Sequence, residues 1–268
     1  LAVLSLLVTV ILAVMLGSLF GWGIALPSSA VPSLHPGWGL LGWTGLLVLG
    51  VGFELVPMLQ LTPPYPRPVA RYLGLSIFLL LVGWSVALWS GDEGRGGMAA
   101  FFAVLMAAAY FAFAVITVAL QRRRKRRIPD VTLDFWRAGM ASLMLASVIW
   151  AAGTASPTRL PESMDILAGV LALFGFAGSV TSGMLYKIMP FLAWFHLQSM
   201  CPPGVLAPNM KQILPDRLQR RQFVAQLIAL ALLCATAIWP GPLVYPAALA
   251  LAVAAVLLHW NLILIVRA

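Results

Sequence analysis

The chain has 268 residues, of which 62% are hydrophobic and 9% are charged, and its formal net charge at pH 7 is +9. Soluble globular domains carry about a quarter charged residues, so this composition excludes a soluble protein. It predicts an all-α, polytopic membrane protein whose first partner is the lipid bilayer.

Eight apolar runs are long enough to cross a bilayer whose hydrocarbon core is about 30 Å thick. They are Leu1–Leu26, Gly37–Leu61, Val69–Trp89, Met98–Leu120, Phe135–Ala152, Met164–Phe195, Phe223–Trp239 and Leu243–Val266. The sixth run needs a bend, which Pro190 supplies because proline removes a backbone N–H and pushes on the preceding turn. The segment Met189–Met200 is therefore a candidate for a separate interfacial helix.

The chain begins at Leu1 inside an apolar run, with no basic n-region and no A-x-A cleavage site before the next span. We interpret residues 1–268 as one transmembrane domain that is a piece of a longer chain. No obvious internal repeat and no soluble domain are expected. The two cysteines, Cys201 and Cys234, fall in different segments, and there is no C-x-x-C-H haem attachment motif.

Basic residues concentrate in the connections after the even-numbered spans, and positive charge is retained on the cytoplasmic side. Most of the 17 lysines and arginines lie there or at the C-terminal end, among them the run Arg122–Arg127. The pattern predicts a multi-pass protein of the bacterial inner membrane with both ends cytoplasmic. We interpret Arg122–Arg127 as a stop-transfer and lipid-headgroup segment, and nucleic-acid binding is not expected.

Tryptophans lie mostly near the predicted span ends, where amphipathic rings prefer the membrane interface. They are Trp43, Trp84, Trp89, Trp136, Trp150 and Trp239. No ligand is needed to explain them.

Ionisable side chains inside a membrane are costly and mark functional sites by default. The candidates are His35, Glu54, Lys187, His196 and His259. Glu54 could conduct protons, bind an ion or hydrogen-bond a neighbouring helix near the headgroups, and these alternatives stay open. Lys187 is expected to snorkel to the cytoplasmic interface.

Depth separates the histidines. His259 lies about 21 Å below the outer surface at about 1.5 Å per residue, whereas His35 lies near that surface, so the two cannot bind one iron. A site between His196 and His259 is geometrically open, but interfacial or packing roles are favoured for both.

His35 begins a helix that carries Gly39, Gly42 and Gly50 on the same face. A face almost without side chains lets either a neighbouring helix or a flat ligand such as a porphyrin lie close to the backbone. The imidazole of His35 could then be an axial ligand.

The segment His35–Leu46 resembles a helix of bacterial membrane proteins related to subunit I of haem-copper oxidases, in the NnrS-like grouping. Leu55–Pro66 and Gly183–His196 look like two further motifs of that grouping. The resemblance implies that His35 binds haem and that an additional N-terminal half is missing here. The ligand role is transferred to His35 only, and Gly39 and Gly42 are candidate haem contacts because of the glycine face. Copper is not expected, because a copper–haem centre needs several closely grouped histidines and the chain has neither His-His nor His-x-His.

Three functions follow from these patterns. The first is a haem-binding protein in respiratory electron transfer, nitric oxide handling or oxidase assembly, working with a redox partner or another membrane subunit. The second is a proton- or ion-coupled transporter that uses Glu54 and Lys187. The third is a scaffold whose glycines only pack helices. No catalytic residue is assigned, because the sequence lacks H-E-x-x-H, Walker A and G-x-S-x-G motifs.

Overall fold

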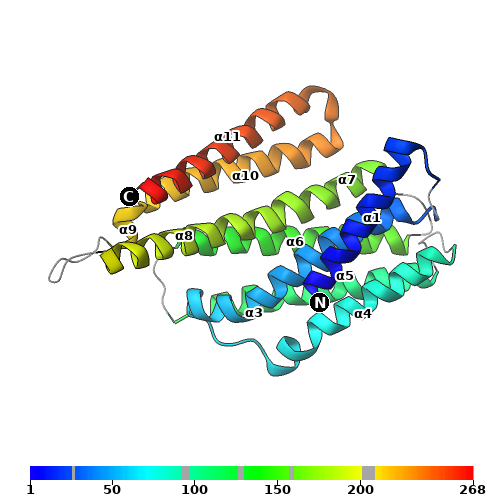
Figure 1. Cartoon of the computed structure of the whole chain (residues 1–268), viewed down its shortest axis with the longest axis horizontal. Helices are drawn as coiled ribbons and strands as arrows, with labels where there is room; N and C mark the ends of the chain where they lie inside the picture. Colours follow the sequence, from blue (N-terminus) through cyan, green and yellow to red (C-terminus); the bar gives the residue numbers. More distant parts are fainter. Residues whose placement is uncertain are drawn as a thin grey trace. The chain divides into compact units, whose positions relative to one another are not determined.

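The computed structural model describes residues 1–25, 28–91, 97–125, 130–156, 158, 160–200 and 209–267, and every regular element in these ranges is helical (Figure 1). Eight helical stretches among them are long and apolar enough to cross a membrane. They are Ala2–Trp22, Val31–Gln60, Arg67–Trp89, Met98–Arg122, Val131–Ala155, Glu162–Met200, Asp216–Ile238 and Pro240–Arg267. The predicted all-α bundle of about eight spans is confirmed.

Thirteen labelled elements make up these spans and one short connection in the described part of the chain. They are α1 (Ala2–Trp22), α2 (Val31–Gly37), η1 (Trp38–Gly45), α3 (Leu46–Gln60), α4 (Arg67–Trp89), α5 (Met98–Arg122), α6 (Val131–Ala155), α7 (Glu162–Val170), η2 (Leu171–Gly178), α8 (Ser179–Met200), α9 (Met210–Ile213), α10 (Asp216–Ile238) and α11 (Pro240–Arg267). The elements η1 and η2 are π-helical segments inside the second and sixth spans.

Helix ends differ from the sequence prediction where a local interaction extends the helix. The second span begins at Val31, because Pro32 fits the first turn, where its missing N–H is not needed. The fifth span begins at Val131, where the Asp130 carboxylate accepts hydrogen bonds from the Thr132 N–H and hydroxyl. Arg126, Arg127 and Cys201 lie outside the described residues, as does the predicted end of the first span at Leu26.

Pro190 does not end its helix. Helix α8 continues through it to Met200, so the interpretation of Met189–Met200 as a separate helix is wrong. Membrane helices tolerate an internal proline when neighbouring groups satisfy the backbone groups that it frees.

The chain divides into two compact units. Unit 1 comprises Leu1–Arg126 with Leu143–Leu173, and unit 2 comprises Arg127–Ser142 with Phe174–Ala268. The boundary passes inside α6 and inside η2, so single helices belong to both units. That 1–268 form one domain stays a prediction.

Unit 1 is built around the second span. Helix α1 packs on η1, and α4 packs along α5. Trp38 of η1 donates a hydrogen bond from Nε1 to the Ser85 hydroxyl of α4 at 2.9 Å. Near the other end of the unit, the Tyr65 and Thr117 hydroxyls are 2.8 Å apart and buried. The first contact holds α4 against the second span, and the second holds the connection between α3 and α4 against α5.

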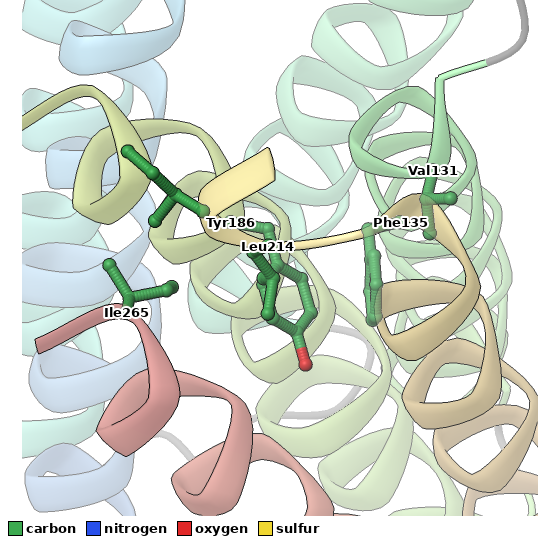
Figure 2. Packing of buried hydrophobic residues seen from close by; sticks show 6 residues of the cluster. Val131, Phe135, Tyr186, Leu214 and Ile265 are labelled. Atoms are coloured by element: carbon green, nitrogen blue, oxygen red, sulfur yellow. The ribbon is translucent and has the colours of Figure 1, made fainter. Parts of the chain in front are cut away.

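In unit 2, helices α10 and α11 run side by side (Figure 1). At one end of the unit, Tyr186 of α8 and Leu214 lie close together in a buried apolar cluster with Val131, Phe135, Ile213 and Ile265 (Figure 2). Asn261 of α11 donates a hydrogen bond to the Tyr186 hydroxyl at 2.8 Å. This bond joins α11 to α8.

The second and sixth spans share a sequence pattern that the sequence analysis missed. Gly42, Gly45, Gly50 and Pro57 recur in the same order and at the same spacing as Gly175, Gly178, Gly183 and Pro190. Each copy holds one of the two π-helical segments. A Cβ atom on Gly42 would lie 2.8 Å from Ser5 Cβ, and one on Gly175 would lie 2.7 Å from Ser142 Cβ. In both copies a serine of the preceding span packs on the glycine, so these spans form an internal repeat.

Candidate functional site

His35 lies half-buried in α2, and its Nδ1 is 3.2 Å from the backbone carbonyl oxygen of Thr9 in α1. A carbonyl oxygen only accepts hydrogen bonds, so Nδ1 is the donor, and the tautomer with its proton on Nδ1 has a lone pair on Nε2. Metal-binding histidines are commonly oriented by such a bond from the other ring nitrogen. The ring of His35 therefore fits the role of an axial ligand.

The glycine face beneath His35 is covered by protein. A Cβ on Gly39 would lie 3.4 Å from Thr9 Cγ2, and one on Gly42 would lie 2.9 Å from Leu81 Cδ2 and still closer to Ser5. The sequence left two alternatives for this face, a neighbouring helix or a flat ligand, and in the structure the neighbouring helix occupies it. A porphyrin has no room on Gly39 and Gly42 in this arrangement, so the fit to haem is confined to the ring of His35.

The other ionisable candidates are divided between the two units. Glu54 is exposed on α3, with no hydrogen bond or ion pair in the described part of the chain. Lys187 donates to Asp130 Oδ2 at 2.9 Å, just before the start of α6, and its snorkelling to the cytoplasmic interface stays a prediction. Glu54 belongs to unit 1 and Lys187 to unit 2.

His196 and His259 are both exposed in unit 2. The Nδ1 of His259 is 2.8 Å from the Ala255 carbonyl oxygen of its own helix. Among the described residues there is no group of three or more His, Cys, Asp and Glu side chains that could hold a metal ion. A shared ligand site for these two histidines stays a prediction.

A cavity of about 390 Å³ in unit 1 was not foreseen. It is lined by Ser33, Pro36, Gly37, Leu40, Leu41, Trp84, Ala107, Tyr110, Leu143, Ala146, Ser147, Trp150, Asp165, Ala168, Gly169 and Ala172. We call it the tryptophan cavity. It lies at the ends of the second to sixth spans that are remote from the basic run beginning at Arg122.

Small residues make the room for the tryptophan cavity. Glycine or alanine lines it from the second, fourth, fifth and sixth spans, at Gly37, Ala107, Ala146, Ala168, Gly169 and Ala172. The ring of Trp84 lies on the backbone of Gly37, where a Cβ would come within 2.5 Å of Trp84 Cζ3. Only glycine permits this approach.

Two indole rings form the main wall. The centroids of Trp84 and Trp150 are 6.1 Å apart, and the ring planes meet at 81°. This edge-to-face arrangement is a preferred one for aromatic pairs, and it presents an electron-rich ring face. Each of these tryptophans was interpreted as an interfacial residue on sequence, and the structure brings them together from two different spans.

Polar groups in the lining are few. The Tyr110 hydroxyl donates to the Leu41 carbonyl oxygen, which holds α5 against η1. Ser147 is buried in the wall, and Asp165 is exposed with Ser33 and Pro36 at the mouth. Among the described residues that line it, there is no lysine, arginine, histidine, cysteine or methionine.

No protein-family model matches the chain, and no match is found among curated proteins or solved structures. The resemblance to subunit I of haem-copper oxidases therefore stays a prediction. Haem binding and ion-coupled transport also stay predictions.

Proposed function

We propose that the protein binds a small organic cation with an apolar body in the tryptophan cavity, as a receptor or carrier in a bacterial inner membrane. The observation that carries the proposal is the Trp84–Trp150 pair in a cavity where, among the residues that the structure describes, Asp165 is the one charged lining residue. With the basic connections in the cytoplasm, the mouth faces the periplasm.

The size and the walls suit such a ligand. Small-molecule sites measure roughly 300–1,000 Å³ and are mostly apolar with a few placed polar groups, and the tryptophan cavity meets both criteria at about 390 Å³. An ammonium group over an indole face gains about 0.5–2 kcal/mol, more as water is excluded. The Asp165 carboxylate adds attraction at the mouth, and the alkyl part of the ligand packs on Leu40, Leu41 and Leu143.

A fluorescence titration tests this function. Purified protein in nanodiscs is titrated with benzyltrimethylammonium and, separately, with its neutral carbon isostere neopentylbenzene. We expect the cation to quench tryptophan fluorescence saturably and to bind about tenfold more tightly than the isostere. Equal binding of the two compounds, or binding of neither, overturns the proposal.

Haem binding is a second candidate, supported by the hydrogen bond between His35 Nδ1 and the Thr9 carbonyl. That bond leaves Nε2 available to bind haem iron as an axial ligand. A bound haem would supply electron transfer or gas binding.

A further inference from the structure

Glu54 lies on an apolar, outward face of the second span. Helix α3 turns Leu47, Val51 and Met58 to the same side as Glu54, and all four residues are exposed. We call them the Glu54 face. Apart from the carboxyl group, this face has the character of a lipid-facing surface.

A carboxylate on such a face is costly. Glu54 lies about 9 Å along the helix from the Gln60 end of α3, at about 1.5 Å rise per residue. Within the residues that the structure describes, its carboxyl group has no hydrogen bond and no ion pair. Ionised side chains in membranes are normally paired or face a polar cavity, and the described part of the chain supplies no partner for this charge.

The internal repeat allows Glu54 to be compared with the charged residue at the same position in the sixth span. Lys187 stands between Gly183 and Pro190 where Glu54 stands between Gly50 and Pro57, at identical spacing. In the sixth span this charge is neutralised, because Lys187 Nζ lies 2.9 Å from Asp130 Oδ2. Glu54 is the equivalent residue in the second span, and it has no counterion among the residues that the structure describes.

We propose that the Glu54 face docks a transmembrane helix of a partner protein, and that this helix presents a lysine or arginine to the Glu54 carboxylate. The apolar residues Leu47, Val51 and Met58 would pack against the partner helix on either side of the ion pair. A second copy of this chain is a poor occupant, because a two-fold contact through this face brings two Glu54 carboxylates together.

Site-specific photo-crosslinking in the native membrane tests the proposal. A benzophenone amino acid is placed at Val51 or Met58 of the full chain, the membranes are irradiated, and the adduct and its crosslinked peptide are identified by mass spectrometry. We expect one membrane protein whose crosslinked helix carries a lysine or arginine. The matched control is Leu249 of α11, which is 67% exposed on an apolar face without a charge, and it should give no such adduct.

Charge variants separate an ion pair from simple proximity. Glu54→Gln should lower the crosslink yield about tenfold, since it removes one charge of a pair in an apolar medium. Glu54→Lys combined with a Glu substitution at the partner's basic residue should restore it. Adducts with lipid alone, an adduct with a second copy of this chain, a partner helix without a basic residue, or a yield unchanged by Glu54→Gln would each overturn the proposal.

Discussion

The indole ring of Trp84 lies on the backbone of Gly37, so close that a Cβ atom on Gly37 would come within 2.5 Å of the ring. Both residues line the tryptophan cavity. The width of the cavity and the position of one of its two indoles therefore depend on the absence of a side chain at one residue in α2.

Gly37→Ala should displace the Trp84 ring, because an aromatic ring cannot bend away as a flexible side chain can. We expect a stability loss of about 1–3 kcal/mol from overpacking, and about tenfold weaker binding of benzyltrimethylammonium. Thermal unfolding and the fluorescence titration measure the two effects. Gly50→Ala is the matched control, because a Cβ there meets nothing within 4 Å. Equal effects of the two substitutions would contradict the role of Gly37.

Trp150→Leu and Asp165→Asn should each weaken binding of the organic cation by about three- to tenfold, and weaken binding of the neutral isostere less. The first removes an indole face and the second removes the charge at the mouth. Trp239→Leu serves as the control, since Trp239 is exposed at the end of α10 in unit 2. A loss of affinity that is the same for both ligands would mean that the cavity selects by shape alone.

The bilayer explains why the spans were predictable. A helix that crosses hydrocarbon must be long, apolar and internally hydrogen-bonded, and these demands are visible in the sequence. The ends were less predictable, since they depend on details such as Pro32 in the first turn of α2 and Asp130 before α6.

The tryptophan cavity could not be predicted, because it depends on which spans are neighbours. Trp84 and Trp150 each resemble an interfacial residue when considered alone. Gly37 and Gly50 are equally plausible packing glycines in the sequence, yet one meets Trp84 and the other meets open space. The repeated glycines around η1 and η2 were a signal in the sequence, and a comparison of the chain with itself would have found them.

Asp130 predicts an acid-sensitive contact in unit 2, just outside the fifth span. Burial raises the pKa of its carboxyl, but hydrogen bonds from Thr132 and the charge of Lys187 outweigh burial, so the pKa lies below its ordinary value of 3.8. Because the pKa is lower in the folded chain than in the unfolded chain, the carboxylate stabilises the fold above pH 3.8. This contribution declines as the pH falls from there through the folded value.

Asp130→Asn should therefore lower stability at neutral pH by about 1–2 kcal/mol and make the acid limb of thermal stability shallower. Thermal unfolding in detergent, measured from neutral pH to below pH 3.8, follows both changes. Asp134→Asn is the control, because Asp134 makes a 3.2 Å ion pair with the exposed Arg220 and such pairs contribute about 0–1 kcal/mol. An acid limb that is equally steep in Asp130→Asn would show that other carboxyl groups govern it.

The haem hypothesis predicts a spectrum that depends on His35. The complete protein should show a Soret band that shifts on reduction, and His35→Ala should remove or alter it, because His35 Nε2 is the proposed axial ligand. His196→Ala should leave the spectrum intact, since His196 is exposed in unit 2. A full wild-type spectrum in His35→Ala would leave the haem hypothesis without its ligand.

The internal repeat predicts that Gly42 and Gly175 tolerate a large side chain equally poorly. Each glycine has a serine of the preceding span packed on it, with a Cβ at either position falling under 3 Å from Ser5 or Ser142. Gly42→Leu and Gly175→Leu should each reduce folding yield and cost about 1–3 kcal/mol, because the helix on the other side cannot yield as a flexible side chain does. Gly50→Leu, with open space beside it, should fold at the wild-type yield.

Double variants sharpen the test. Ser5→Gly should recover part of the loss in Gly42→Leu, and Ser142→Gly should recover part of the loss in Gly175→Leu. Recovery at one position and not at the other would show that the two spans share a sequence pattern without sharing a packing mode.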